Sequence, residues 1–351
     1  MTVQPLRALP ISRIPDPATA PPLRWGILST GGIARAMTDA LTPHTRQQVV
    51  AVGSRSEESA RNFAETFGID RAHGSMEALL ADEQVDAVYV ASPHSEHHRQ
   101  ALAAIAAGKH VLVEKAFTRT AAEAAEVVAA ARAAGVTAME AMWTRFLPHI
   151  DVLRQLLADG ALGEIRTVLA DHGQYFDRDP EHRLFNPDLA GGALLDLGIY
   201  PVSFASMVLG TPNRITAAGT RAFTGVDGQV SMVLENAGVP TSEPGDSPGA
   251  HAVLNTSLFG VTPTTASVAG TVARVDLSGA FYAPGTLTYR HRDGGRLDVD
   301  GGQITGHRGL AYEAAHLAQL VADGQTESPL LPLDETVQIL RTLDEVRRQI
   351  G

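Results

Sequence analysis

The stretch Arg24–Ala34 combines an apolar run with a glycine turn in an order that suits the binding of a phosphate group. Its residues, Arg-Trp-Gly-Ile-Leu-Ser-Thr-Gly-Gly-Ile-Ala, read as a short strand, a tight turn and the start of a helix. Gly31 lets backbone approach a pyrophosphate, and the helix presents unpaired N–H groups to the anion. The pattern Ser29-x-Gly31-x-x-Ala34 lacks the first glycine of G-x-G-x-x-G/A, so this turn alone is a weak signal. We expect a dinucleotide site lined by Ser29, Thr30, Gly31, Gly32 and Ile33.

The residues after the next predicted strand, Gln48–Gly53, bear on which dinucleotide is bound. An NAD site usually has Asp or Glu there, which accepts a hydrogen bond from the ribose 2′-OH. This chain has Ser54 and Arg55, and a guanidinium can pair with a 2′-phosphate and stack on adenine. We therefore expect NADP, with NAD less favoured. Two readings compete with this one: Arg55 is a solvated strand-end residue, or Glu57 reaches a ribose.

Three further segments hold polar side chains that could do chemistry: Ser92–His97, Glu114–Ala116 and Gly191–Tyr200. The first two directly follow predicted buried strands, and the carboxyl ends of such strands carry the active site in open parallel sheets. Asp196 and Tyr200 share a face if their segment is helical, because they are four residues apart.

Histidines in the first of these segments could suggest a metal site. His94 and His97 are three residues apart and His98 follows, but no carboxylate or third ligand accompanies them convincingly. Packing of a nucleotide-binding loop explains them better, so we predict no metal.

The chain between Leu23 and Met142 alternates apolar strands with helices. Strands are predicted at residues 48–53, 85–91, 110–113 and 136–140, and the caps of the intervening helices at Ser56, Ser75, Ser95 and Thr120. Continuous apolar strands alternating with helices imply a parallel, doubly wound sheet. The predicted fold class is therefore α/β, with a Rossmann-type domain over residues 23–142.

After Trp143 the chain becomes rich in strands separated by Gly and Pro. A helix is predicted at Ile150–Ala158, and strands at residues 165–176, 214–219, 229–234, 252–259, 265–277 and 285–289. Pro240–Pro248 reads as an exposed loop, and helices follow at about Tyr312–Ala322 and Glu335–Gln349. Residues 143–351 are thus predicted to form an α+β domain with a large, mostly antiparallel sheet. The open face of such a sheet usually needs covering, so we expect a homodimer or homotetramer formed through it.

The composition narrows the class of protein. The chain has 351 residues, of which 44% are hydrophobic and 19% charged, as expected for two domains. Its net charge of −11 argues against a nucleic-acid or anionic-membrane partner. The absence of cysteine excludes disulfides and favours the cytoplasm. No apolar run is expected to span a membrane, and the proline-rich residues 1–22 are predicted to be a disordered extension.

Together these motifs resemble the Gfo/Idh/MocA oxidoreductase family along nearly the whole chain after Leu23. Members carry a turn like Gly-Thr-Gly-x-Ile-Ala, a Thr-Pro-Asn-x-x-His segment, Glu-Lys-Pro, and Gly-Gly-Gly-x-Leu-x-Asp-x-Gly-x-His/Tyr. The matching segments here are Ser29–Ala34, Ser92–His97, Glu114–Ala116 and Ala190–Tyr200. Four more segments are similar to the dimeric dihydrodiol dehydrogenase branch, which includes xylose dehydrogenases: Met139–Phe146, Arg183–Pro187, Asp196–Tyr200 and Glu327–Asp334.

The resemblance implies hydride transfer between nicotinamide C4 and a secondary alcohol of a sugar or trans-diol. Lys115 would lie beside the nicotinamide, Tyr200 would exchange the hydroxyl proton, and Asp196 would bond the substrate or orient the lysine. A free tyrosine has a pKa of about 10, and a nearby ammonium group would favour its phenolate. The substrate would contact Lys115, Trp143, Phe176, Arg183, Asp196 and Tyr200. The cofactor would also contact Ser92, Pro93, His94, His97, Glu114, Lys115, Trp143 and Arg145.

Two departures from the family pattern matter. Ser29 replaces the first glycine of the turn, which the dihydrodiol branch tolerates. Ala116 replaces the proline of Glu-Lys-Pro, where the family's lysine–proline bond is typically cis. The Lys115–Ala116 bond is therefore either trans, with a displaced lysine, or cis at a cost of about 3–4 kcal/mol.

Structural explanations compete with each functional one. Lys115 could be a surface residue, Tyr200 a core tyrosine, and Asp196 a cap or ion-pair partner. Trp143 and Arg145 could pack at a domain interface. Two other functions also stay open: a regulator that binds NAD(P) without turnover, and an NAD-linked inositol or sugar dehydrogenase. The presence of Lys115, Asp196 and Tyr200 together argues against a non-catalytic regulator. Tyr200 and Arg55 argue against an NAD-linked inositol or sugar dehydrogenase.

Overall fold

The computed structural model describes residues 6–236 and 249–351, which form two compact units. One gathers residues 15–146 and 306–337, and we call it the parallel-sheet unit. The other gathers residues 6–14, 147–305 and 338–351, and we call it the mixed-sheet unit. Pro240–Pro248, predicted as a loop, lies outside the described residues.

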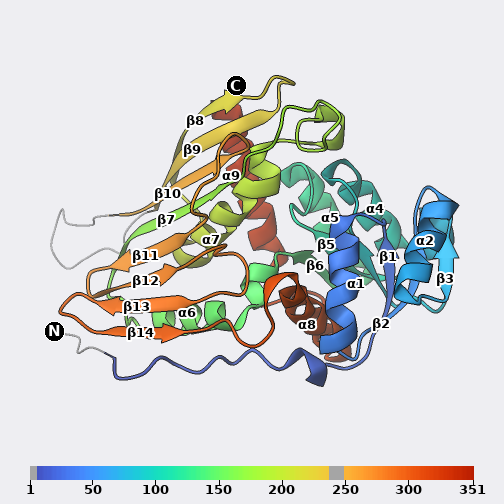
Figure 1. The fold of residues 1–351 in the computed structure, drawn as a ribbon, viewed down its shortest axis with the longest axis horizontal. Coiled ribbons are helices and arrows are strands. Elements are labelled where there is room, and N and C mark those ends of the chain that lie inside the picture. The colour runs from blue at the N-terminus through green and yellow to red at the C-terminus, as the bar shows by residue number, and fades with distance from the viewer. Residues whose placement is uncertain (1–5, 237–248) are drawn as a thin grey trace. The chain divides into compact units, whose positions relative to one another are not determined.

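The parallel-sheet unit is built on a six-stranded sheet in the order β3-β2-β1-β4-β5-β6, with every neighbouring pair parallel (Figure 1). This is the strand order of a doubly wound dinucleotide-binding fold, so the predicted Rossmann-type sheet is confirmed. Its strands are β1 (Arg24–Leu28), β2 (Gln48–Gly53), β3 (Arg71–His73), β4 (Ala87–Val90), β5 (His110–Glu114) and β6 (Ala138–Ala141). Its helices are α1 (Gly32–His44), α2 (Glu57–Phe67), α3 (Met76–Leu80), α4 (His94–Ala106), α5 (Ala121–Ala134) and α8 (Leu310–Ala322), with short turns η1 (Pro17–Thr19), η2 (Trp143–Phe146) and η5 (Gly306–Gly309).

A side-chain cap begins three of these six helices: α2, α3 and α5. The Ser56 hydroxyl accepts from the Ser59 N–H at the start of α2, and Thr120 accepts from the Glu123 N–H at the start of α5. The predicted Ser95 cap is wrong. Pro93 occupies the capping position, with φ −60° and ψ 152°, so helix α4 begins at His94, two residues earlier than a Ser95 cap predicts.

Residues 306–337 belong to the parallel-sheet unit, although we predicted a single C-terminal domain over residues 143–351. Helix α8 packs beside α1 and against β5, and buries Leu310, Leu317 and Leu320. An apolar helix face shows that a helix packs, but it does not identify the partner. Helix α9 (Leu333–Gln349) begins in this unit and ends in the mixed-sheet unit.

Residues 6–22 make specific contacts, in contrast to the predicted disordered extension. Arg13 donates from its backbone N–H and its guanidinium to Asp151, with N–O distances of 2.7 and 3.0 Å. Within the parallel-sheet unit, the Arg46 guanidinium donates to the carbonyls of Thr19 and Ala20. These hydrogen bonds give partners to backbone groups of the proline-rich segment. Composition alone could not predict them, because their partners lie far away in the sequence.

The mixed-sheet unit contains an eight-stranded sheet in the order β14-β13-β12-β11-β7-β10-β9-β8 (Figure 1). Only the β7–β10 pair is parallel, so the predicted mostly antiparallel sheet is confirmed. Residues 265–277, predicted as one strand, form two. The strands are β7 (Ile165–Gly173), β8 (Arg214–Arg221), β9 (Asp227–Asn236), β10 (Ala250–Ser257), β11 (Ala266–Gly270), β12 (Ala273–Leu277), β13 (Leu287–His291) and β14 (Arg296–Val299).

Helices α6 (Pro148–Ala158) and α7 (Ile199–Leu209) complete this unit, together with η3 (Pro187–Leu189) and a π-helical turn, η4 (Leu194–Gly198). The stretch Pro187–Leu209 is, by its length and composition, apolar enough to cross a membrane. This differs from our expectation that no apolar run is long enough to do so. Most of it is buried within the protein, as in the core helix of a globular unit.

Candidate active site

The turn after β1 leaves room for a phosphate group against its backbone. Gly31 precedes α1, whose N-terminus has no side-chain cap. A methyl group placed on Gly32 would meet no atom within 4 Å. Ser29 takes a φ of +112°, which favours glycine, and its hydroxyl accepts from the Gly31 N–H at 3.3 Å. An uncapped thirteen-residue helix behind an open glycine turn fits a dinucleotide pyrophosphate.

The end of β2 presents a cation, Arg55, that has no ion-pair partner among the described residues. Arg55 is exposed and follows Ser54, whose N–H donates to the His73 carbonyl at 3.0 Å. Glu57, the residue that could instead have reached a ribose, is ion-paired with Arg61. This arrangement favours a phosphate over a ribose hydroxyl beside Arg55.

Lys115 lies at the carboxyl end of β5, at the same edge of the sheet as the glycine turn. Its bond to Ala116 is cis. The backbone around it is held by side chains: the Lys115 N–H donates to Glu114 Oε2 at 3.1 Å, and the Phe117 N–H donates to Glu140 Oε1 at 3.1 Å. The second oxygen of Glu114 accepts from the Tyr89 hydroxyl.

The histidines of the Ser92–His97 segment also bind this loop. His94 Nε2 lies 3.2 Å from the Lys115 carbonyl oxygen, and His97 Nδ1 lies 2.8 Å from that of Ala116. His97 Nε2 lies 2.8 Å from the Ser92 carbonyl oxygen. His97 is fully buried, and this burial lowers its pKa. The side chains that could have suggested a metal site therefore join the loop after β4 to the loop after β5.

Trp143 and Arg145, predicted to lie near the nicotinamide, are almost fully buried in η2. The Trp143 ring stacks on His307 with 5.9 Å between ring centroids. The Arg145 guanidinium is paired with Glu335 at 2.7 Å and also donates to the Leu330 carbonyl. Arg145 thus ties η2 to the first turn of α9 and to the segment before it.

In the mixed-sheet unit, Asp196 lies in the π-helical turn and Tyr200 at the start of α7. The two glycines before them allow a close approach that a side chain would prevent. A methyl group on Gly191 would lie 2.6 Å from the Leu184 carbonyl oxygen, and one on Gly192, with φ +124°, would lie 2.5 Å from Asp227 Oδ1. The Leu194 N–H then donates to Asp227 at 2.6 Å.

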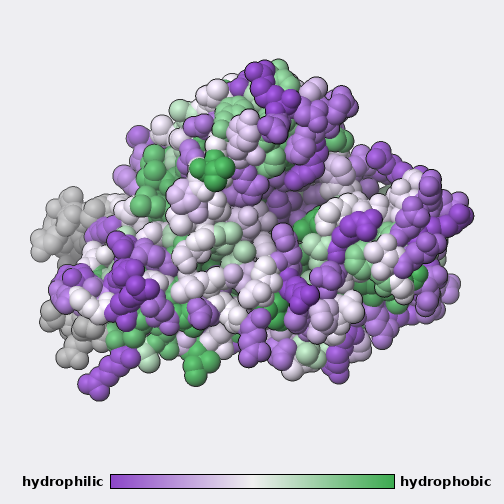
Figure 2. Space-filling model, in the orientation of Figure 1, coloured by the Kyte–Doolittle hydropathy of each residue, from purple (hydrophilic) through white to green (hydrophobic). Residues whose placement is uncertain are grey.

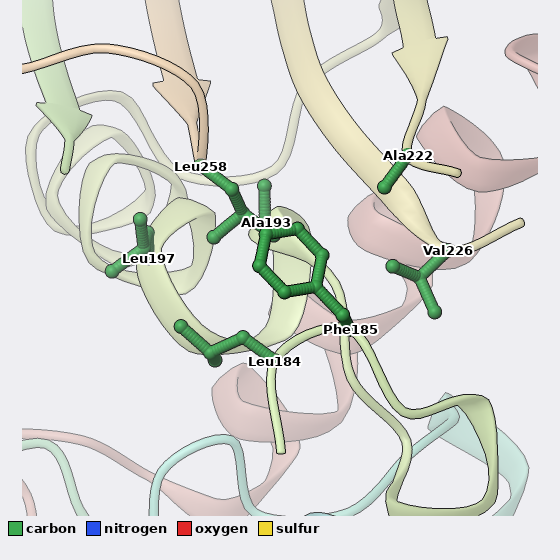
Figure 3. Packing of buried hydrophobic residues seen from close by; sticks show 7 residues of the cluster. All are labelled: Leu184, Phe185, Ala193, Leu197, Ala222, Val226 and Leu258. Carbon is green, nitrogen blue, oxygen red and sulfur yellow. The ribbon is translucent and has the colours of Figure 1, made fainter. Parts of the chain in front are cut away.

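Arg183 makes a two-pronged ion pair with Asp196, with N–O distances of 3.0 and 3.2 Å. The two residues after Arg183 hold its loop in place. Leu184 and Phe185 are buried against the helical segment that contains Ala193 and Leu197 (Figure 3). Asp196 thereby has a cation partner of its own. Phe176, predicted to contact substrate, packs against this cluster.

Tyr200 is about nine-tenths buried in an aromatic group that the sequence analysis did not identify. Its ring stacks on Tyr282 at 4.2 Å between centroids and lies 5.6 Å from His172. Burial, with the charge of Asp196 as a second cause, raises the pKa of Tyr282. Tyr282 comes from a loop after β12 and His172 from β7, so no local pattern links them to Tyr200.

Comparisons with known proteins agree with this geometry. Residues 23–142 match the family model of an oxidoreductase family with an NAD-binding Rossmann fold, and residues 150–276 match the GFO/IDH/MocA C-terminal domain. The chain belongs to the Gfo/Idh/MocA oxidoreductase family. It is thus an NAD(P)-dependent dehydrogenase or reductase.

Named relatives extend along almost the whole chain. Trans-1,2-dihydrobenzene-1,2-diol dehydrogenases of Bos taurus and Homo sapiens are each 38% identical over 94% of this chain and 97% of theirs. Among solved structures, the 3-ketoreductase KijD10 of Actinomadura kijaniata, in complex with NADP and TDP-benzene, is 26% identical with a TM-score of 0.80, covering 94% of this chain and 98% of that one. Aldose-aldose oxidoreductase of Caulobacter crescentus, complexed with glycerol, is 26% identical with a TM-score of 0.81 over 94% and 97%.

Two buried carboxyl groups behind the lysine loop were also missed by the sequence analysis. Glu140 ends a predicted apolar strand, and a glutamate there was a visible signal. Glu313 is fully buried on α8, and neither of its oxygens has a hydrogen-bond partner among the described residues. Burial, reinforced by the charges of Glu114 and Glu140, raises the pKa of Glu313 well above its ordinary value.

The raised pKa of Glu313 predicts a pH-dependent stability. The unfolded chain ionises this carboxyl at about pH 4.3 and the folded protein does so only at higher pH, so its contribution to stability falls as pH rises above the unfolded-state pKa. Glu313→Gln cannot ionise. We expect it to raise the melting temperature by at least about 2 °C at pH 8 and to change it little at pH 5. Thermal unfolding at both pH values, with exposed Glu83→Gln as control, tests this. Equal destabilisation at both pH values would contradict it.

Proposed function

We propose that this protein is an NADP-dependent oxidoreductase that transfers hydride between nicotinamide C4 and a secondary alcohol or carbonyl of a sugar or trans-diol. Lys115 and Tyr200 form its catalytic pair. One observation carries the proposal: a lysine whose loop is held by buried side chains lies at the same sheet edge as an open glycine turn. The trans-diol substrate of the 38% identical relatives and the NADP bound by KijD10 support it.

NADP, when bound, supplies or accepts the hydride, and the protein moves the proton. In the oxidative direction the substrate hydroxyl gives its proton to the Tyr200 phenolate as its C–H bond gives up a hydride. In reduction the Tyr200 hydroxyl protonates the new alkoxide. The Lys115 ammonium stabilises the phenolate in one direction and the alkoxide in the other. Because Asp196 is neutralised by Arg183, we assign it to positioning a substrate hydroxyl beside Arg183.

Removing either catalytic side chain should abolish proton transfer but leave the cofactor bound. We expect Lys115→Met and Tyr200→Phe to lower kcat by about 100-fold or more. The assay follows NADPH absorbance with trans-1,2-dihydrobenzene-1,2-diol and with aldoses such as xylose. NADPH affinity, measured by quenching of Trp25 and Trp143 fluorescence, should change little. Full turnover in both variants would disprove the assignment.

Arg55 should determine the preference for NADPH over NADH. We expect the wild-type chain to bind NADPH at least about tenfold more tightly, because a guanidinium–phosphate pair contributes more than 1 kcal/mol. Arg55→Ala should remove most of that preference by weakening NADPH alone. Arg341→Ala, which removes an exposed guanidinium on α9, is the control. A wild-type preference for NADH would instead favour an NAD-linked sugar dehydrogenase.

We also propose a homodimer or homotetramer assembled through the open face of the eight-stranded sheet. A row of neighbouring residues crosses that face from β11 to β8: Ser267, Leu169, Val253, Val233 and Thr216. Leu169 and Val253 are 49% and 46% exposed and line a shallow groove of about 500 Å³. On the face of the molecule seen in Figure 2, by contrast, hydrophobic side chains form small areas among hydrophilic ones. An apolar row of this kind usually contacts a partner.

A charge within the row should separate the copies. We expect Val253→Asp to convert an oligomer into a monomer, as measured by light scattering, because burying an unpaired carboxylate costs several kcal/mol. Val261→Asp, at an 84% exposed valine outside the sheet, is the matched control and should leave the mass unchanged. A monomeric wild-type protein would refute the proposed assembly.

A further inference from the structure

Glu140 differs from the other side chains that hold the lysine loop. Its Oε1 accepts from the Phe117 N–H at 3.1 Å, and its Oε2 accepts from the Thr336 hydroxyl at 3.2 Å. Both donors are neutral, and the side chain is 1% exposed. A carboxylate in such surroundings lacks a directly bonded cation, so its ionised form is costly. Glu140 therefore connects a titratable group to the backbone two residues after Lys115.

We propose that Glu140 is a positioning residue for Lys115, and that its protonation state sets how firmly the loop that carries the lysine is held. The proposal rests on the proposed function only in treating Lys115 as the catalytic lysine. An ionised Glu140 accepts a stronger, charge-assisted hydrogen bond from the Phe117 N–H than a protonated one does.

The titration of Glu140 falls in the physiological range. Burial raises its pKa to about 7, partly offset by the bonds from Phe117 and Thr336 and by the charge of Arg145. Raising the pH through 7 therefore ionises Glu140. This change tightens the loop that carries Lys115. Turnover that depends on the position of Lys115 should gain from it.

The other charged groups around Glu140 have settled roles. Arg145, from η2, is paired with Glu335. Glu114, from β5, accepts from Tyr89 and raises the pKa of Glu140 by repulsion. Burial and the charges of Glu114 and Glu140 raise the pKa of Glu313, from α8, well above its ordinary value. Burial lowers the pKa of His97. His94, bonded to the Lys115 carbonyl, is the neighbour whose titration must be separated from that of Glu140.

The sequence offers a probe that needs no substrate. The chain contains two lysines, Lys109 and Lys115. Lysine labelled with ¹³C at Cε therefore gives two NMR signals. Lys109 donates to the carbonyls of Asp82 and Val85, on the opposite end of β5 from Lys115, so it serves as an internal control. The experiment follows both signals of the full-length protein from pH 5.5 to 9.

We expect the Lys115 signal to show a step centred near pH 7 in the wild-type protein. Glu140→Gln keeps an oxygen for the Phe117 N–H but cannot ionise, and it should abolish the step. Thr336→Val removes a bond that stabilises the carboxylate, and it should move the step to higher pH. His94→Gln and the exposed control Glu83→Gln should leave it in place. A step that survives in Glu140→Gln, or that His94→Gln abolishes, would overturn the proposal.

Turnover supplies the second readout once a substrate responds. At pH 8, Glu140→Gln should oxidise it about three- to tenfold more slowly than wild type, with little change in KM, and the difference should disappear at pH 6. Glu140→Ala, which also releases the Phe117 N–H, should be slower at both pH values, and Gln should rescue it at pH 6. If the NMR step depends on Glu140 but Lys115→Met keeps full turnover, the proposed function fails and the coupling stands. If turnover needs Lys115 but the step is absent, the inference alone fails.

Discussion

The lysine loop depends on one constraint: backbone N–H and C=O groups at the buried end of β5 must find partners away from water. A regular strand would satisfy them through its neighbours, but the chain leaves the sheet at Lys115. An unpaired buried backbone group costs as much as a lost hydrogen bond. Here carboxylates receive the two N–H groups and histidine rings meet the two carbonyls. The side chains that complete the backbone also fix the direction from which the lysine leaves it.

This solution brings charge into the interior. Glu114, Glu140 and Glu313 are all nearly or fully buried in one unit. Three ionised carboxyl groups buried near one another would repel one another strongly. The protein resolves this by giving them different partners. Glu114 has a tyrosine hydroxyl and a backbone N–H, Glu140 has two neutral donors, and Glu313 has no partner among the described residues. Burial raises the pKa of Glu140 to about 7 and that of Glu313 well above its ordinary value, as expected for acids in unequal surroundings.

Local signals were sufficient for much of the fold and for the positions of the main chemical groups. A few consecutive residues are enough to recognise the helix caps at Ser56 and Thr120 and the buried apolar runs of β4 and β5. Contacts distant in sequence were not predictable in this way. Tyr282 stacks on Tyr200 from eighty-two residues away along the chain, and α8 joins a sheet whose last strand ended at Ala141. Asp196 illustrates the limit within the site: its spacing from Tyr200 was visible, but its partner Arg183 was predicted only as a substrate contact.

Glu140 shows what an apolar pattern hides. Within Val136–Ala141 it looks like the polar end of a strand, and its side chain is 1% exposed. An apolar residue of similar size would pack there without the cost of burying a carboxyl group, but it would leave the Phe117 N–H without an acceptor. A glutamine would accept that bond but could not change its charge. A buried glutamate does both, so its presence is explained by the backbone it holds, and its ionisation changes how firmly that backbone is held.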